Sequence, residues 1–245
     1  MKQQLNFKYE MLSLSHSFLL RLKLEDNIVN ELNEYLDKLR ESKNKKSHAH
    51  TLVGQINQDE KSQQLLMDHN DDRCVNLREI CLAVSKQYLL RYNENSGNKV
   101  KGDRLPEIDE MWSVHSYEGD YNPLHSHGTK SLMGVSVTTW TKVPKQIEEK
   151  EQLVPGQDLF NASGVHDGYI NFNYGISDIR DSERLKFSAY TPIKPEVGVL
   201  YVFPSWMQHS VYPFFGEGER RTVAANVNMW PVDMTDKAKA QHHGA

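Results

Sequence analysis

The sequence predicts a mainly β domain preceded by helices, in the class of antiparallel sandwiches and barrels. All nine prolines and all four tryptophans of the 245 residues lie at or after Pro106. Short runs rich in β-branched and aromatic residues follow that point, separated by Gly, Pro and Asn, as is typical of strands joined by turns. The connections are too short for repeated crossover helices, which argues against a parallel doubly wound sheet. We therefore divide the chain into an N-terminal helical support region (1–104), a β core (105–232) and a flexible polar tail (233–245).

The first 104 residues carry two helical patterns. From Asp26 or Asn27 onward, apolar residues recur with the spacing of one helix face, namely Ile28, Val29, Leu32, Tyr35, Leu36 and Leu39. A second helix is marked by Leu77, Ile80, Cys81, Val84 and Tyr88, with Asn76 and Glu79 placed as in a capping box. Around these helices we expect a polar basic loop over 42–50, a short helix over 62–69 and a linker over 93–104.

The second part of the chain alternates strand-like runs with turn residues. Strands are expected over Met111–Tyr117, Leu132–Val143, Tyr169–Tyr174, Gly198–Phe203 and Thr222–Met229. The charged segment 145–154 reads as an exposed excursion between two of them.

Composition excludes several classes of protein. No apolar run approaches the length of a membrane span, and the first twelve residues lack the apolar core of a signal peptide. Cys74 and Cys81 fall on one expected helix, where a bridge is geometrically awkward, so we expect a reducing, cytoplasmic compartment. The net charge of -4 argues against a general nucleic-acid surface. The N-terminal helices are expected to brace the sheet and are also candidates for a homodimer face.

Three of the eleven histidines form a pattern that suits a metal. His125 and His127 are separated by one residue, so on an extended segment both side chains point to the same face. His209 follows the apolar strand that ends in Phe-Pro-Ser-Trp, which places it at a strand-end turn. Solvated or structural histidines are the ordinary alternative for each residue taken alone.

An anion-binding pattern follows eleven residues after the last of these histidines. On a strand, Arg220, Thr222, Ala224 and Asn226 share one face, while Arg221 points to the other. An arginine with a hydroxyl two residues away can hold a carboxylate, and the small alanine leaves room for a ligand. The phase of the strand decides which arginine faces inward; we prefer Arg220. Further candidates to line a shared cavity are Trp112, Tyr117, Asn122, Trp140 and Asn226.

These motifs, in this order, resemble the 2-oxoglutarate- and Fe(II)-dependent oxygenases. Gly119–His127, Gly198–His209 and Glu219–Asn226 carry the resemblance, which covers roughly half the chain and is strongest to a group common in phage and bacterial genomes. It implies a double-stranded β-helix (jelly-roll) core buttressed by the helices. It also implies a dioxygenase that uses Fe(II), 2-oxoglutarate and O2, with His125 and His209 as iron ligands. Arg220, assisted by Thr222, would bind the distal carboxylate of 2-oxoglutarate.

One residue departs from the usual motif of that superfamily. His127 stands where a carboxylate ligand is expected. Three explanations remain open: His127 is the third ligand, a nearby carboxylate (Asp120 or Glu118) replaces it, or only two side chains hold iron. We favour the first, because His127 shares the face of His125.

The implied reaction is oxidative decarboxylation of 2-oxoglutarate to succinate, coupled to hydroxylation of a substrate. We lean to a protein or peptide residue such as proline, with a small molecule as the other substrate class. Two alternatives remain: a three-histidine zinc hydrolase or hydratase, and a cupin-like binding module without catalysis. A zinc hydrolase has no need of the carboxylate site at Arg220.

Overall fold

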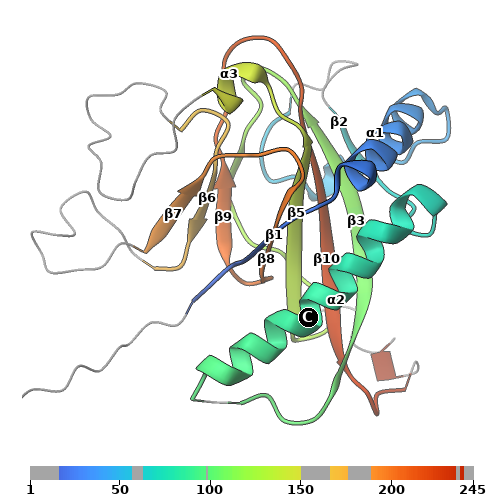
Figure 1. The fold of residues 1–245 in the computed structure, drawn as a ribbon, viewed down its shortest axis with the longest axis vertical. Helices are drawn as coiled ribbons and strands as arrows, with labels where there is room; N and C mark the ends of the chain where they lie inside the picture. The colour runs from blue at the N-terminus through green and yellow to red at the C-terminus, as the bar shows by residue number, and fades with distance from the viewer. Residues whose placement is uncertain are drawn as a thin grey trace, which may run out of the picture.

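The computed structural model describes residues 17–56, 63–97, 99–149, 166–175, 189–235 and 238–239. Two antiparallel sheets dominate it (Figure 1). The larger sheet has the strand order β1 (Leu20–Lys23), β8 (Val199–Pro204), β5 (Gly134–Lys142), β10 (Arg220–Pro231), β3 (Arg104–Ser116) and β2 (Gln63–Leu66). The smaller sheet has the order β4 (Asn122–His125), β9 (Gln208–Val211), β6 (Ile170–Asn173) and β7 (Tyr190–Ile193). The expected jelly-roll class is thereby confirmed.

Two long helices cover the outer face of the larger sheet, away from the smaller one (Figure 1). They are α1 (Asp26–Glu41) and α2 (Asp72–Asn95); the shorter helices are η1 (Ala49–Thr51) and α3 (Lys145–Glu148). Helix α1 buries the predicted apolar face, including Leu32 and Leu36. Helix α2 begins earlier than expected, because the Asp71 side chain accepts a hydrogen bond from the backbone of Arg73 and caps it.

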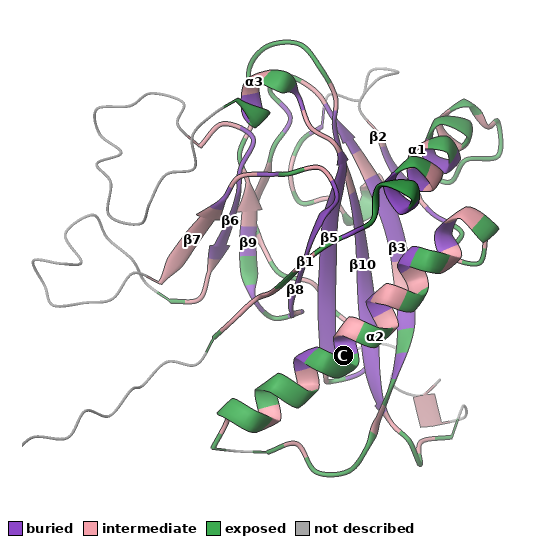
Figure 2. Cartoon of the chain, in the orientation of Figure 1, coloured by how far each residue is buried: buried purple, intermediate pink, exposed green. Residues whose placement is uncertain are grey.

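Most residues of the long strands β5 and β10 are buried (Figure 2), and alternation along the strands of the larger sheet separates two cores. On β8, Leu200 and Val202 face the helices, whereas Tyr201 and Phe203 face the smaller sheet. Strand β10 follows the same rule, with Val223 among the residues on the helix side. The strands are buried on both faces, as expected for a sheet packed between helices and a second sheet.

The helix expected over 62–69 is wrong. Gln63–Leu66 instead forms β2, which pairs with β3, and His69 lies in a turn. Leu20–Lys23 likewise forms β1 and pairs with β8. The N-terminal region therefore supplies both edge strands of the larger sheet as well as the helices, because available partners override weak local preference.

The remaining expectations concern the two cysteines, membrane-spanning helices, the charged segment 145–154 and the C-terminal tail. Cys74 and Cys81 are free, buried thiols on α2. No helix in the described part of the chain is long and apolar enough to cross a membrane. Of the charged excursion, 145–148 form α3, and 150–154 lie outside the described residues, as do 236–237 and 240–245 of the expected tail.

Candidate active site

Pairing of β4 with β9 brings the three predicted histidines together. His125 ends β4, and its partner across the sheet is His209 on β9, just past the turn that follows β8. His127 follows β4, where its backbone N–H donates to the carbonyl oxygen of Ser205 at 2.9 Å. One ring nitrogen from each of the three histidines lies within 4.8 Å of those of the other two. Among the described residues, these three side chains form the group of potential metal ligands that lies close enough together to hold one ion.

Hydrogen bonds fix the same tautomer on all three rings. The Nδ1 atom of His125 lies 2.7 Å from the carbonyl oxygen of Pro123, and that of His209 lies 3.2 Å from the carbonyl oxygen of Met207. The Nδ1 atom of His127 lies 2.9 Å from Asn226 Oδ1. Since these oxygens only accept, each Nδ1 donates and each Nε2 keeps its lone pair. Three Nε2 atoms are thus available as metal ligands.

Burial keeps the three imidazoles neutral. It lowers the pKa of His127 to about 4, lowers that of His125, and lowers that of His209 well below its ordinary value. The neighbouring imidazoles lower the pKa of His209 further. Neutral imidazole is the form that binds a metal, so the cluster needs no deprotonation near pH 7.

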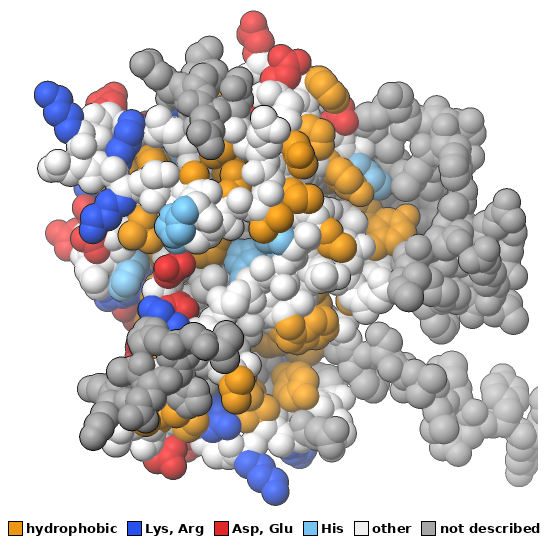
Figure 3. All heavy atoms as spheres, turned by 180° about the vertical axis from the view of Figure 1, so that it is seen from behind, with side chains coloured by type: hydrophobic (Ala, Val, Ile, Leu, Met, Phe, Trp, Pro, Cys, Tyr) orange, Lys and Arg blue, Asp and Glu red, His pale blue; other side chains and the backbone are white. Residues whose placement is uncertain are grey.

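The histidines face a cavity of about 260 Å³ between the two sheets. Figure 3 shows histidine side chains near the centre of the face opposite the helices, with hydrophobic side chains around them. The predicted face of β10 lines this cavity through Arg220, Thr222, Ala224 and Asn226. The strand phase preferred from the sequence is therefore the one the structure has.

Arg220 is a buried cation with an unused donor. Only 2% of the residue is exposed, and Nη1 donates to the carbonyl oxygens of Gly168 and Tyr212, each at 3.0 Å. Its Nε atom has no hydrogen-bond partner among the described residues. Burial lowers the pKa of Arg220 to about 10, and the nearby Asp120 opposes this shift, so the guanidinium remains charged at neutral pH.

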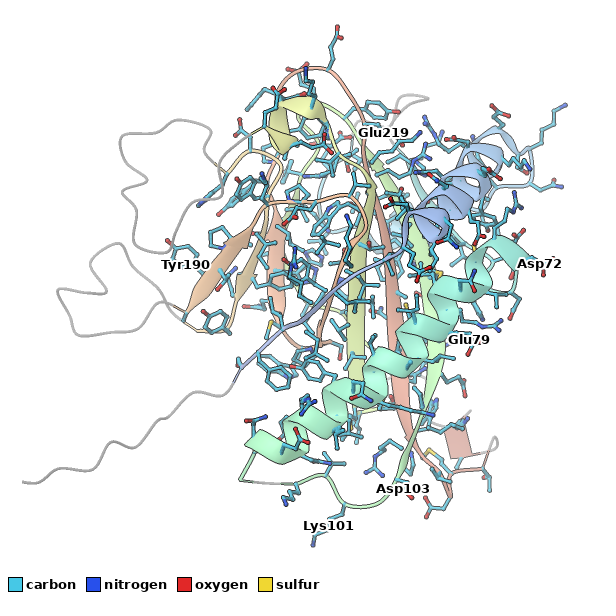
Figure 4. All side chains as sticks on the ribbon, viewed as in Figure 1. Asp72, Glu79, Lys101, Asp103, Tyr190 and Glu219 are labelled. Atoms are coloured by element: carbon cyan, nitrogen blue, oxygen red, sulfur yellow. The ribbon has the colours of Figure 1, made fainter. Side chains whose placement is uncertain are left out.

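Arg221 lies on the opposite face and is fully engaged in ion pairs. Its guanidinium contacts Glu219 at 2.8 Å and Asp37 of α1 at 2.6 Å, and donates to Asn33 at 3.1 Å. Figure 4 labels Glu219 at the end of β10 near α1. Arg221 thus ties the sheet to a helix and leaves the cavity to Arg220.

The two predicted asparagines contact the histidines directly. Asn226 Oδ1 accepts from His127 and from Ser136 at 2.8 Å, so this amide orients an imidazole. Asn122 Nδ2 lies 3.1 Å from Nε2 of His125, and Asn122 Oδ1 accepts from the backbone N–H of Gly54 at 2.8 Å. Both side chains line the cavity.

The alternative carboxylates lie outside the histidine cluster. Asp120 is buried and accepts from the backbone of Tyr117 at 2.8 Å. Glu118 accepts from the backbone of Gly216 at 3.1 Å. Of the aromatic candidates, Trp112 and Trp140 line the cavity, whereas Tyr117 is not part of its wall.

One wall of the cavity comes from the N-terminal region and escaped prediction. It consists of His48, Thr51, Leu52, Val53, Ile56 and Gln64. The segment docks on β4 through a bridge between Gln55 and Tyr121 and through the bond from Gly54 to Asn122. The signal in the sequence was weak, because SKNKKSHAH reads as a solvated basic loop.

Comparison with known proteins finds one family similar to the part of the chain that carries the cavity. Residues 110–226 match the family described as "Putative 2OG-Fe(II) oxygenase". A comparison with curated proteins found no match.

Several solved structures share the fold at low sequence identity. A prolyl-4-hydroxylase from Pseudomonas putida has a TM-score of 0.50 and 16% identity, covering 86% of this chain and 92% of that one. A prolyl hydroxylase from Trichoplax adhaerens, solved with a peptide fragment of the hypoxia inducible factor oxygen degradation domain, has a TM-score of 0.51 and 13% identity over 93% and 87%. AviO1 from Streptomyces viridochromogenes has a TM-score of 0.52 and 10% identity over 89% and 92%. The matched segment contains all three histidines and the inward face of β10, so the part of the chain that carries the cavity is similar to the 2OG-Fe(II) oxygenase family.

Proposed function

We propose that His125, His127 and His209 hold Fe(II) and that Arg220 binds the distal carboxylate of 2-oxoglutarate in the same cavity. We further propose that the enzyme hydroxylates a residue of a protein or peptide. One observation carries the proposal: three imidazoles, each with a lone pair on Nε2, share a cavity with a buried guanidinium.

The histidine set fits Fe(II). Imidazole nitrogen is a good ligand for iron, and the oxygen acceptors behind each Nδ1 orient the rings toward a common point. Because all three ligands are neutral, the metal would keep one more positive charge than in a site with two histidines and one carboxylate. Bound Fe(II), with 2-oxoglutarate and O2, supplies the oxidising chemistry that converts the cosubstrate to succinate and hydroxylates a C–H bond.

Arg220 fits a carboxylate. A buried, charged guanidinium attracts anions, and although Asp120 lies nearby, the Nε–H of Arg220 remains able to donate a charge-assisted hydrogen bond to a carboxylate. Thr222 and Ala224 separate Arg220 from Asn226 along the same face, which leaves a channel lined by small or polar groups between the cation and the histidines. The chain thus holds an anion at one point and a metal at another, which orients an elongated dicarboxylate between them.

The substrate class is supported by two of the solved structures. The proteins from Pseudomonas putida and Trichoplax adhaerens are named as prolyl hydroxylases, and the second was solved with a peptide. Neither the zinc hydrolase nor the binding module gains support from the comparisons, and the buried Arg220 has no evident use in a zinc hydrolase.

Succinate formation tests the reaction before the substrate is known. Purified protein with Fe(II), ascorbate and 2-oxoglutarate is expected to release succinate slowly in the absence of substrate. His209→Ala should abolish the release, whereas His69→Ala, outside the cavity, should not. Succinate release that persists in His209→Ala would remove this histidine from the metal site.

The assignment of His127 has its own test. Because aspartate is the usual residue at this position in the superfamily, His127→Asp should retain Fe(II) binding, measured by metal content after gel filtration. His127→Leu should lower that content. Equal metal content in His127→Leu and wild type would show that two side chains suffice.

A further inference from the structure

The cavity has a second charged end, opposite Arg220. Register pairing places Arg220 beside Ser116 and Asn226 beside Glu110 on β3. Since His127 is bonded to Asn226, the histidines lie toward the Glu110 end. The space beyond them, away from Arg220, is the part left for a substrate.

The carboxylate at this end is weakly compensated. Oε2 of Glu110 lies 3.4 Å from Nε2 of His48, its one ion-pair partner among the described residues, and 43% of the Glu110 side chain is exposed. Burial lowers the pKa of His48, so this imidazole contributes no charge near pH 7. Lys130 pairs instead with Asp109 at 2.8 Å. Glu110 thus brings a net negative charge to the cavity.

A second acceptor is buried in the wall of the same cavity. Gln64 is 4% exposed and lines the cavity. Its Nε2 donates to the carbonyl oxygen of His48 at 3.1 Å and to Thr51 Oγ1 at 3.0 Å. The carbonyl of His48 can only accept, which fixes the orientation of the amide. Oε1 then has no hydrogen-bond partner among the described residues, although a buried acceptor ordinarily has one.

An indole ring separates this end from the histidine cluster. The ring of Trp112 lies 5.4 Å from that of His48 and 5.4 Å from that of His127, measured between centroids. Its face is an attractive surface for a cation. A carboxylate, an unpaired amide oxygen and an indole therefore border one space.

We propose that the space bordered by Glu110, Gln64 and Trp112 binds a cationic nitrogen of the substrate, an ammonium or guanidinium group. The inference rests on the proposed function, because it uses the same cavity. Such a group has several N–H donors and a positive charge, which match two oxygen acceptors and an aromatic face. The hydroxylated carbon would then lie near a basic side chain of a peptide, or within a small amine.

Matched peptides test the charge requirement. One pool of synthetic peptides carries a proline one to four residues from a lysine, and a second pool is identical except that each lysine is Nε-acetylated. Spermidine and free lysine represent small amines. Succinate release above the substrate-free rate, with calorimetric binding in the absence of O2, is measured for wild type, Glu110→Gln and Glu107→Gln. Glu107 is the control, because it lies on the same strand, is exposed and is not part of the cavity wall.

The charged pool should bind and be turned over about tenfold better than the acetylated pool, the effect of losing one charge-assisted hydrogen bond. Glu110→Gln should remove the difference and Glu107→Gln should retain it. A response to the small amines alone would support the cation site with a small-molecule substrate. Equal or absent binding of the charged and acetylated probes, or a preference that survives in Glu110→Gln, would overturn the inference. Absence of substrate-free succinate release with charge-dependent binding intact would instead count against the proposed function.

Discussion

Arg220 and Arg221 are neighbours in sequence with opposite environments. Alternation along β10 turns the first into the cavity and the second toward α1. Arg220 keeps an unpartnered Nε, whereas both ends of the Arg221 guanidinium contact carboxylates. The same type of side chain therefore has a free donor beside the cavity in one case, as the proposed role of Arg220 requires, and attaches a helix to the sheet in the other.

The two arginines should separate in a pair of alanine variants. Arg220→Ala should raise the KM for 2-oxoglutarate at least tenfold, because one charge-assisted hydrogen bond contributes about 1.5–3 kcal/mol. Arg221→Ala should leave that KM nearly unchanged but lower the free energy of unfolding by about 1.5–3 kcal/mol, since Glu219 then keeps only the more distant cations Arg40 and Lys142, each at 3.7 Å. Succinate release against cosubstrate concentration, with thermal unfolding, checks both. The reverse pattern would contradict the orientation of the strand.

Glu219 should give the fold an acid-sensitive component. Burial alone would raise its pKa, but hydrogen bonds from His115 and Arg221 lower the pKa of Glu219 to about 2, against an ordinary 4.5. A carboxyl group with a lowered pKa stabilises the fold fully above its unfolded pKa, and this contribution is lost as pH falls toward 2. The stability difference between wild type and Glu219→Gln, from urea unfolding, should therefore shrink between about pH 4.5 and pH 2. Glu217→Gln, at an exposed position two residues away, is the matched control for these urea measurements.

At the scale of elements, the sequence predicted helices and strands best where the pattern of apolar residues extended over many positions. The nine-residue β5 and the twelve-residue β10 show alternation, and α1 shows a helical face, so each could be predicted. Strands β1, β2, β4, β7 and β9 have four residues each, too few for a period to be recognised, and their pairing depends on distant partners. The same limit hid the wall around His48 and Gln64, which tertiary pairing alone brings to the histidines.

The docking of this wall on β4 depends on a glycine. A Cβ at Gly54 would lie 2.2 Å from the carbonyl oxygen of Tyr121 and 2.6 Å from Cα of Asn122, both backbone atoms. Gly54→Ala should therefore displace the segment, weaken the bond to Asn122 and lower the free energy of unfolding by about 1–3 kcal/mol. Gly97→Ala is the matched control, because an added Cβ meets nothing within 4 Å there. Thermal unfolding and limited proteolysis should separate the two variants; equal behaviour would mean that the wall does not need this close approach.

At the scale of the whole molecule, the N-terminal region is part of the same structure as the β core. It covers the larger sheet with α1 and α2, contributes both edge strands and closes one side of the cavity (Figure 1). That the chain divides near residue 105 into a supporting region and a core that carries the site remains a prediction. The contacts imply that neither part buries its apolar surface without the other, since α1, α2 and the larger sheet share one hydrophobic core.

Unfolding should therefore be a single transition in which both parts take part. All four tryptophans lie at or after Trp112, whereas both long helices precede residue 96, so the two parts have separate spectroscopic signals. Tryptophan fluorescence and helical circular dichroism should give the same urea midpoint. Leu36→Ala, at a fully buried position of the shared core, should lower the free energy of unfolding by about 2–5 kcal/mol and shift both midpoints together. If only the helical signal moved, the helices would be a separately folding unit and the sheet would stand without them.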